Sequence, residues 1–146
     1  MRISKVKSYA KLNLALNVTG KLISLHKIES IVAFIYLHDS IIIKQVESKK
    51  HKISFSGKFS KNIKKNNTVE KLFNTLDEQK LLNDKKFQIK IKKNIPQEAG
   101  LGGGSMNAAN ILNFLIKKKF IKLNQEKIMD ISNLIGSDVI LGINPT

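Results

Sequence analysis

The clearest chemical feature of this chain is a glycine-rich loop at residues 96–106, which reads PQEAGLGGGSM. Its glycines are Gly100, Gly102, Gly103 and Gly104. Because glycine has no Cβ, such a loop lets backbone N–H groups approach an anion closely. A helix-forming sequence follows, and the N-terminus of a helix adds the positive end of its dipole. The sequence therefore predicts a phosphate-binding loop that needs neither metal ligands nor a cysteine.

The loop departs from the two commonest phosphate-binding patterns. A P-loop has a lysine and then a serine or threonine after its last glycine, and no such lysine is present. A dinucleotide-binding loop reads G-x-G-x-x-G; Gly100 and Gly102 fit, but Ser105 stands at the last position. A flexible linker is the plain alternative, yet a linker has no need for Leu101 at its centre or for an apolar helix directly behind it.

The first half of the chain reads as strands. Apolar residues occupy every second position in residues 11–18, which predicts a strand, and residues 19–21 read as a turn. A second apolar run covers residues 28–43, with a polar interruption at residues 38–40, and a short alternating segment follows at residues 52–56. These segments predict antiparallel strands joined by hairpins.

A helix and a strand are predicted immediately before the glycine loop. Asn67 has the form of an N-cap, with the acidic Glu70 three residues later. Apolar residues at helical spacing follow over residues 69–76, so this segment predicts an amphipathic helix. The alternation in residues 87–91 predicts the strand that leads into the loop.

The segment after the loop predicts two more helices. Residues 108–116 are apolar on most of a helical surface, which indicates a buried central helix. Asn124 is placed to cap a further helix whose apolar face covers residues 128–135, and Gly136 is placed as its C′ residue. Residues 139–141 predict the start of another strand. The pattern as a whole indicates mixed α and β structure in one domain.

The charge is strongly positive but is carried almost entirely by lysine. The net charge is +15, and Arg2 is the only arginine among 26 basic residues. Arginine is the preferred residue for bidentate contacts to bases and phosphates, and stacking on bases uses aromatic rings, of which this chain has few. With lysines spread along the whole chain, the sequence disfavours nucleic acid as a partner and fits a compositional bias. An anionic substrate would benefit from the positive field in either case.

Several classes of chemistry are excluded or disfavoured by composition. The chain has no cysteine, so disulfides and thiolate chemistry are excluded. The histidines are His26, His38 and His51, and their spacing is not that of metal ligands. No segment approaches the roughly 18 to 20 apolar residues of a membrane span. The basic N-terminus leads into an alternating strand rather than an apolar signal core, and we therefore expect a cytoplasmic location.

Three segments, in this order, resemble the GHMP family of small-molecule kinases. They are YAKLNL at residues 9–14, the glycine loop with its leading Pro96, and IGSDV at residues 135–139. The residues of these three motifs are most similar to those of the branch of the family that acts on 4-diphosphocytidyl-2-C-methyl-D-erythritol. This substrate belongs to the non-mevalonate route to isoprenoid precursors. The resemblance runs over nearly all of the chain, and the three motifs together are far more specific than any one alone.

The resemblance implies a fold and a domain arrangement. It implies an α+β fold of the ribosomal protein S5 domain 2 type, with a left-handed βαβ crossover. Residues 1–146 would form the N-terminal ATP-binding domain. The family has a second, C-terminal domain that grips the substrate, and this domain is absent from the chain. We therefore expect either a longer protein or a second chain that completes the cleft.

The resemblance also implies a reaction. The family uses ATP and Mg²⁺ to phosphorylate a hydroxyl, here the 2-hydroxyl of the cytidyl-diphospho-methylerythritol substrate. Asp138 would accept or orient the hydroxyl proton, and Lys11 would lie beside it, keep it ionised and offset charge on the transferring phosphoryl group.

The same resemblance assigns the whole glycine loop to the nucleotide. The loop would wrap the ATP phosphates, and Ser105 would in addition reach a phosphate oxygen or the magnesium ion. The residues that this assignment covers are Pro96, Gln97, Glu98, Ala99, Gly100, Leu101, Gly102, Gly103, Gly104, Ser105 and Met106.

The substrate-binding residues are carried over with two departures from the family pattern. Asn13 and His26 match positions that contact the cytidyl-methylerythritol substrate in the family. Members usually have an aromatic residue before the histidine, where this chain has Leu25, which offers no ring face for a base. The second serine of the loop is replaced by Met106, which has no hydroxyl.

Each of these residues also has a simpler interpretation when taken singly. Asp138 could order a turn, Lys11 could be a solvated lysine and His26 a surface histidine. Ser105 could be the N-cap of the following helix. For the whole chain, the alternatives are another GHMP small-molecule kinase, a basic RNA-binding module with an S5-like fold, or a remnant without activity.

Overall fold

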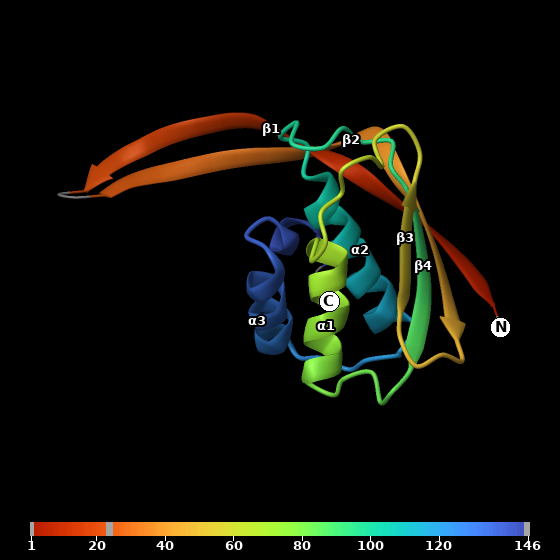
Figure 1. Ribbon diagram of the computed structural model, residues 1–146. Coiled ribbons are helices and arrows are strands. Elements are labelled where there is room, and N and C mark those ends of the chain that lie inside the picture. The colour runs from red at the N-terminus through yellow and green to blue at the C-terminus, as the bar shows by residue number, and fades with distance from the viewer. Residues whose placement is uncertain (1, 23–24, 145–146) are drawn as a thin grey trace.

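The computed structural model describes residues 2–22 and 25–144, and for residues 15–22 and 25–31 it describes the backbone alone. A mixed sheet packs against three helices (Figure 1). In chain order the elements are β1 (Ile3–Leu22), β2 (Leu25–Val46), β3 (Lys52–Ser56), α1 (Thr68–Glu78), β4 (Lys86–Lys92), α2 (Gly103–Lys117), α3 (Gln125–Ile135) and the 3-10 helix η1 (Val139–Gly142). The predicted α+β architecture is thus confirmed.

The strands are arranged in the order β1-β2-β4-β3. β1 pairs antiparallel with β2, and β2 pairs antiparallel with β4. β3 pairs parallel with β4, and α1 provides the crossover between them. The prediction that β3 forms a hairpin with the preceding strand is therefore wrong: β3 lies at the far edge of the sheet, beyond β4.

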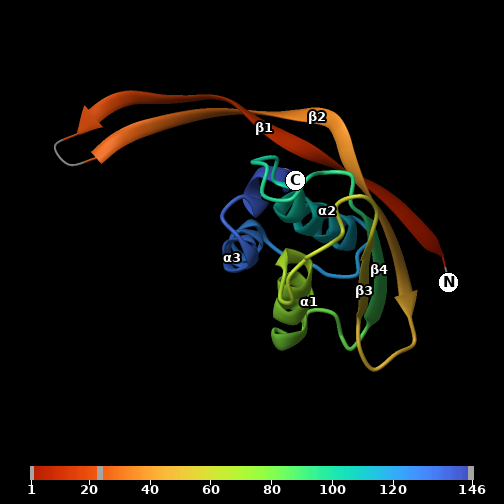
Figure 2. The same ribbon diagram turned by 45° about the horizontal axis from the view of Figure 1, so that its top comes forward.

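All three helices lie on one face of the sheet, as Figures 1 and 2 show from two directions. The core between the layers is apolar. It includes Ile41 and Ile43 of β2, Phe87 and Ile89 of β4, and Leu112 of α2. The second half of β1 and the first half of β2 extend beyond this body as a two-stranded arm (Figure 1).

The polar segment at residues 19–21 lies inside a strand rather than forming the predicted turn. It belongs to β1, which continues to Leu22. A register shift between Val18 and Gly20 occurs in the pairing with β2. The prediction of a turn at residues 19–21 is therefore wrong.

The polar segment at residues 38–40 does not interrupt its strand either, because β2 is continuous through it. Asp39 is fully buried there. Its carboxylate accepts hydrogen bonds from the backbone N–H groups of Asn94 and Ile95 at 2.7 and 2.9 Å. Because these hydrogen bonds come from outside β2, the carboxylate can be buried while the strand stays continuous.

The predicted helix starts are confirmed. Asn67 caps α1 by accepting from the backbone N–H groups of Val69 and Glu70. Asn124 caps α3 by accepting from the backbone N–H group of Lys127. Both caps are local, so the sequence alone was sufficient to place them.

The end of α3 differs from the prediction. Gly136 ends this helix with φ of 177°, which is extended backbone rather than the left-handed C′ conformation. The segment at residues 139–141 forms η1 instead of a strand. None of the helices within residues 2–22 and 25–144 has both the length and the apolar character needed to cross a membrane.

Candidate functional site

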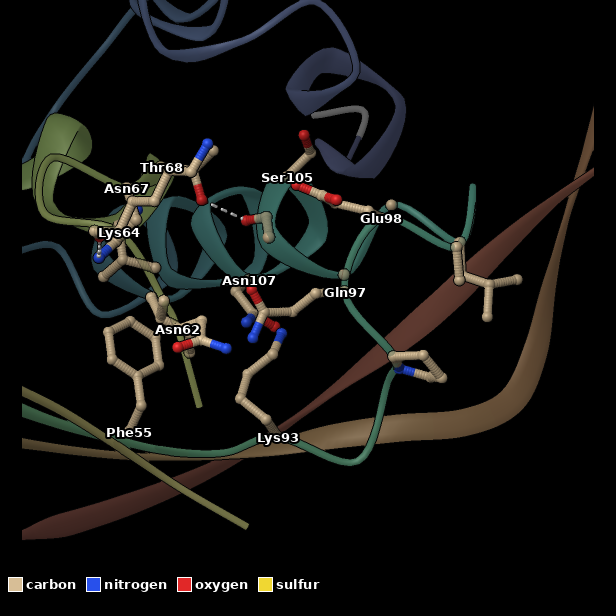
Figure 3. Close-up of a pocket in the computed structure, with 18 of the residues that line it drawn as sticks. Phe55, Asn62, Lys64, Asn67, Thr68, Lys93, Gln97, Glu98, Ser105 and Asn107 are labelled. Atoms are coloured by element: carbon tan, nitrogen blue, oxygen red, sulfur yellow. Dashed lines mark hydrogen bonds between the residues drawn. The ribbon is translucent and has the colours of Figure 1, made fainter. Parts of the chain in front are cut away.

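The glycine loop connects β4 to α2 and forms one wall of a cavity of about 460 Å³ (Figure 3). Residues 62–69 line the cavity from the other side, and side chains of Phe55, Lys71, Lys93 and Asn107 complete the lining. The cavity therefore has glycine backbone on one side and several lysines around it, which is a setting suited to a phosphorylated ligand.

All but one of the residues predicted for the loop line this cavity. They are Pro96, Gln97, Glu98, Ala99, Gly100, Leu101, Gly102, Gly103, Gly104 and Ser105. Ala99 lies at the exposed turn of the loop, next to Gly100 with its φ of 74°. The exception is Met106, which does not line the cavity.

The N-terminus of α2 opens into this loop without a side-chain cap. Gly102 is the N-cap residue, with φ of 65°, and it offers no side-chain acceptor to the first turn of the helix. The interpretation of Ser105 as an N-cap is therefore wrong, because Ser105 lies inside the first turn. Uncapped N–H groups at a helix N-terminus, combined with the dipole, favour an anion at this end.

The loop is fixed to its surroundings by hydrogen bonds from both sides of the cavity. Thr68 Oγ1, at the start of α1, donates to the carbonyl of Gly104 at 2.6 Å (Figure 3). Gln97 Nε2 donates to the carbonyls of Phe59 and Lys61 at 2.7 and 2.8 Å. The cavity walls are thus held together by contacts between segments far apart in the sequence.

Lys11 and Asp138 lie together, although 127 positions separate them in the sequence. Lys11 Nζ is 3.4 Å from Asp138 Oδ2. The lysine side chain is 5% exposed and the aspartate side chain 46% exposed. The carboxylate therefore has a fixed cation on one side and an open side toward solvent, as a group that takes a proton from a substrate hydroxyl requires.

Lys11 is in direct contact with the loop. Its backbone N–H donates to the carbonyl of Leu101 at 2.9 Å. Its side chain runs along Gly102, where an added Cβ would lie 2.7 Å from Lys11 Cγ. Glycine at this position is required both by its positive φ and by the close approach of Lys11. The Lys11–Asp138 ion pair and the glycine loop are therefore in direct contact through Lys11.

Two predicted loop residues take different places. Ser105 lines the cavity, and its Oγ lies 3.8 Å from the position of a Cβ added to Gly136, close to the segment that carries Asp138. Met106 is fully buried and does not line the cavity, and its backbone N–H donates to the carbonyl of Gly102 within the helix. The structure therefore gives Met106 a packing role and gives Ser105 a position between the cavity and the ion pair.

The two predicted substrate-binding residues lie on the strands of the arm. Asn13 is exposed on β1, two residues beyond Lys11. The backbone of His26 pairs with Lys21 near the start of β2, and the His26 side chain lies outside what the structure describes. Asn13 and Lys11 lie on the same strand, so both could contact one substrate. The substrate-binding roles of Asn13 and His26 stay predictions.

Two buried polar groups at the cavity were not found by sequence reasoning. Lys93, which is 4% exposed, forms an ion pair with Asp39 and reaches into the cavity toward Asn107 (Figure 3). Asn107 is 1% exposed, and its Oδ1 has no hydrogen-bond partner in the structure. The sequence signal was Asp39 within an apolar strand, because a buried carboxylate needs a cation or N–H donors nearby.

Comparison with known proteins identifies the family of this chain. The GHMP kinases N terminal domain model matches residues 67–144, and the chain belongs to this family. The chain is 62% identical over 146 residues to a 4-diphosphocytidyl-2-C-methyl-D-erythritol kinase from Pelagibacter ubique (strain HTCC1062), covering 100% of this chain and 52% of that protein. A kinase of the same name from Francisella tularensis subsp. novicida (strain U112) is 34% identical over 140 residues, which is 95% of this chain and 50% of the relative.

Solved structures show the same fold. A crystal structure of 4-(cytidine 5'-diphospho)-2C-methyl-D-erythritol kinase aligns with a TM-score of 0.71 at 25% identity, covering 95% of this chain and 48% of that one. A galactokinase from Lactococcus lactis complexed with galactose aligns with a TM-score of 0.61 at 14% identity, which shows the fold alone; 98% of this chain and 39% of that one are covered. The chain spans about half the length of the curated relatives it matches.

Proposed function

We propose that this chain is the nucleotide-binding half of a kinase that uses ATP to phosphorylate the 2-hydroxyl of 4-diphosphocytidyl-2-C-methyl-D-erythritol. The observation that carries the proposal is the Lys11–Asp138 pair, held at 3.4 Å directly beside the glycine loop. The kinase name of the 62% identical relative supports the choice of substrate.

The residues of the cavity fit a nucleoside triphosphate. The first turn of α2 has no side-chain cap, so its N–H groups are available to phosphate oxygens. The buried Oδ1 of Asn107, which has no partner, is a group that a ligand donor would satisfy. Lys64, Lys65 and Lys71 line the same space and offset the negative charge of the polyphosphate.

The residues also fit a magnesium ion that is bound mainly through phosphates. No group of three or more histidine, cysteine, aspartate or glutamate side chains able to hold a metal occurs in the described part of the chain. Mg²⁺ commonly uses only one or two carboxylates together with phosphate oxygens and water. Ser105 and Glu98, whose carboxylate points toward Ser105 in Figure 3, are the oxygen donors that would hold it. When bound, the ion would neutralise charge on the phosphates.

The residues of this chain would have separate roles in the reaction. The loop orients the phosphates, and Lys11 holds the Asp138 carboxylate in place while its charge faces the transferring phosphoryl group. Asp138 accepts the proton of the substrate hydroxyl on its exposed side. Asn13, farther along β1, and His26 on β2 would contact the substrate from the arm. The sequence has Leu25 where the family usually has an aromatic residue, so base stacking at that position would be weaker.

The test is Asp138→Asn in the protein together with the C-terminal half that its relatives contain. We expect kcat to fall by about 10² or more, the usual contribution of a general base, while ATP binding measured by calorimetry is retained. Asp130→Asn, an exposed aspartate on α3, is the matched control and should leave kcat unchanged. A kcat for Asp138→Asn within about twofold of the wild type would show that Asp138 is not the base.

A further inference from the structure

Within the part of the chain that the structure describes, no helix covers one face of the sheet, which we call the open sheet face. The three helices cover the opposite face (Figures 1 and 2). Buried residues of β2 and β4, such as Ile41, Ile43 and Ile89, point toward these helices. Since side chains alternate along a strand, the residues between them point to the other face. The cavity at the glycine loop includes Phe55 and the N-terminus of α2, so it lies on the helical side.

Lysines gather on this open sheet face, which we define by the outward positions of the four strands. Strand pairing places Lys5 of β1 and Lys90 of β4 on either side of Ile42. Lys7 and Lys92 flank the middle strand in the same way in the next row. No acidic side chain occupies an outward position of these strands among the side chains that the structure describes. The lysines of the open face are Lys5, Lys7, Lys44, Lys52, Lys90 and Lys92.

The open sheet face differs from the helical side in where the acidic residues lie. Asp39, on β2, is buried and points toward the helical side. Lys86, at the start of β4, is drawn toward the helices by an ion pair with Asp77 at 3.1 Å. Five of the 11 acidic residues lie on two helices, namely Glu70, Asp77 and Glu78 on α1, and Glu126 and Asp130 on α3. The helical side therefore carries both lysines and acidic residues, whereas the described outward positions of the strands carry lysines without acidic neighbours.

An aromatic cluster lies at one end of the same face. Tyr9 and His38 are paired across β1 and β2, and their ring centroids are 5.4 Å apart. The ring of Tyr36 lies 6.2 Å from that of Tyr9 and 6.1 Å from that of His38. Tyr36 is 80% exposed, which is unusual for a residue that normally buries its ring. Such a ring beside a basic surface can stack on a base.

We propose that the open sheet face binds single-stranded nucleic acid, with phosphates on the lysine rows and a base on Tyr36. A sheet that presents aromatic rings within a basic surface is a common way to bind single strands. The outward positions between the lysines include the polar Ser40 and Gln88 as well as Ile42, so polar and apolar residues are mixed there rather than gathered into the broad apolar face that enters a lipid surface. Scattered lysines disfavour this partner at the level of sequence, and the fold is what brings them together.

The test is fluorescence anisotropy with a labelled single-stranded RNA of about 12 nucleotides, within the span that such surfaces cover. It uses the protein together with the C-terminal half that its relatives contain. The wild type should bind, with an affinity that falls steeply with salt. Lys90→Gln with Lys92→Gln should reduce the slope of log K against log salt by about 1.4, because each lost phosphate contact on a single strand contributes about 0.7.

A matched control removes the same charge elsewhere. Lys117→Gln with Lys122→Gln changes two exposed lysines at and after the end of α2 and should leave the slope nearly unchanged. The proposal is overturned if both double lysine variants lower the slope equally, or if the protein binds phosphatidylglycerol vesicles and not RNA.

Tyr36→Ala separates stacking from charge. It should weaken RNA binding about tenfold without changing the salt slope, since a base stacked on an aromatic ring contributes roughly that factor. Circular dichroism should show an unchanged fold, because the ring is mostly exposed. An RNA affinity equal to that of the wild type would show that no base stacks on Tyr36.

Displacement by nucleotide distinguishes this surface from the glycine-loop cavity. Saturating ATP with Mg²⁺ should leave RNA bound, because the cavity lies on the helical side of the sheet. Release of RNA by ATP would place the RNA in the cavity and overturn the assignment to the open face. RNA binding with no ATP binding would support the open face and count against the kinase proposal alone.

Discussion

The chain contains two lysine–aspartate pairs beside the glycine loop, and they differ in how completely the carboxylate is satisfied. Asp39 is fully buried and accepts from Lys93 Nζ and from two backbone N–H groups. Asp138 is 46% exposed and has Lys11 as its ion-pair partner at 3.4 Å. A carboxylate whose oxygens are occupied holds structure together, whereas one with an open side can take a proton from a substrate.

The two lysines are matched in burial, since their side chains are each 5% exposed. What separates the pairs is therefore the aspartate and its surroundings. Asp39 is placed in the middle of a continuous strand, against the residues that precede the loop. Asp138 follows α3 and precedes η1, at the surface. Two lysine–aspartate pairs with the same residue types therefore have different surroundings. The buried pair is suited to stabilising the fold, and the exposed pair is suited to proton transfer.

The largest effect expected from this comparison is on stability. Asp39→Asn should lower the free energy of unfolding by about 3–5 kcal/mol, because Lys93 then stays buried without a counter-charge. Asp138→Asn also removes the counter-charge of a buried lysine, Lys11, but the 46% exposed position of Asp138 lets water reach that side of the pair, so its cost should be smaller, about 1–2 kcal/mol. Urea denaturation of the two variants measures the difference.

A double variant checks the cause of the Asp39 effect. Asp39→Asn combined with Lys93→Met removes the uncompensated charge, so part of the lost stability should return. If the double variant is no more stable than Asp39→Asn alone, the buried charge is not the source of the loss.

Two neighbouring glycines allow each lysine to be disturbed separately. A Cβ at Gly102 would lie 2.7 Å from Lys11 Cγ, and one at Gly103 would lie 3.3 Å from Lys93 Nζ. Gly102→Ala also has to adopt φ of 65°, so it should cost about 1–3 kcal/mol and displace the lysine of the open pair. We expect phosphoryl transfer by the completed protein to fall more than about tenfold, as a misplaced catalytic group typically does.

Gly100→Ala is the control for backbone strain. Gly100 has φ of 74°, and nothing lies within 4 Å of the position of its Cβ. It should share the stability cost of the positive φ but spare Lys11. Equal losses of activity in Gly100→Ala and Gly102→Ala would mean that loop strain, and not the contact with Lys11, sets the rate.

The fold was predictable where it depends on nearby residues. The caps of α1 and α3 at Asn67 and Asn124, and the alternation in β4, are local signals and were confirmed. The parallel partner of β3 was not predictable, because pairing with β4 depends on where the chain returns after α1. The continuity of β2 through Asp39 likewise depends on N–H groups that lie 55 and 56 positions away.

The site was predictable in part for the same reason. The glycine loop stands out in the sequence, and the resemblance predicted that Lys11 and Asp138 lie side by side, which they do. Lys93 could not be distinguished among the lysines, since its burial follows from its place at the end of β4 beside Asp39. Met106 was assigned to the loop, but helical geometry turns its side chain into the core.

A third acid–base pair, formed by His51 and Asp77, lies at the opposite end of the sheet, and its effect on stability should depend on pH. His51 Nδ1 accepts from the backbone N–H of Phe87 at 3.0 Å, and its Nε2 is 3.2 Å from Asp77 Oδ1. Burial lowers the pKa of His51 below 6.5, and the neighbouring Asp77 only partly offsets this. The folded protein therefore holds the imidazole neutral, which its acceptor role at Nδ1 also requires.

Stability should consequently decrease on acidification. Below pH 6.5 the unfolded chain binds a proton that the folded chain resists, so stability is complete above that value and is lost as the pH falls through the lower folded-state pKa of His51. His51→Gln should cost about 1–2 kcal/mol at alkaline pH, where hydrogen bonds are lost, and less at acidic pH. Thermal denaturation across this pKa measures the change, and an equal cost on both sides would exclude His51 as its source.

The smallest expected effect comes from the hydrogen bond that joins the cavity walls. Thr68→Val removes the donor to the carbonyl of Gly104 and keeps the shape of the side chain, so it should cost about 1 kcal/mol. Because Gly104 belongs to the glycine loop and not to either ion pair, ATP affinity should weaken a few-fold while kcat stays near the wild-type value. A fall in kcat with unchanged ATP affinity would mean that Thr68 supports the open pair at Lys11 and Asp138 rather than the phosphates.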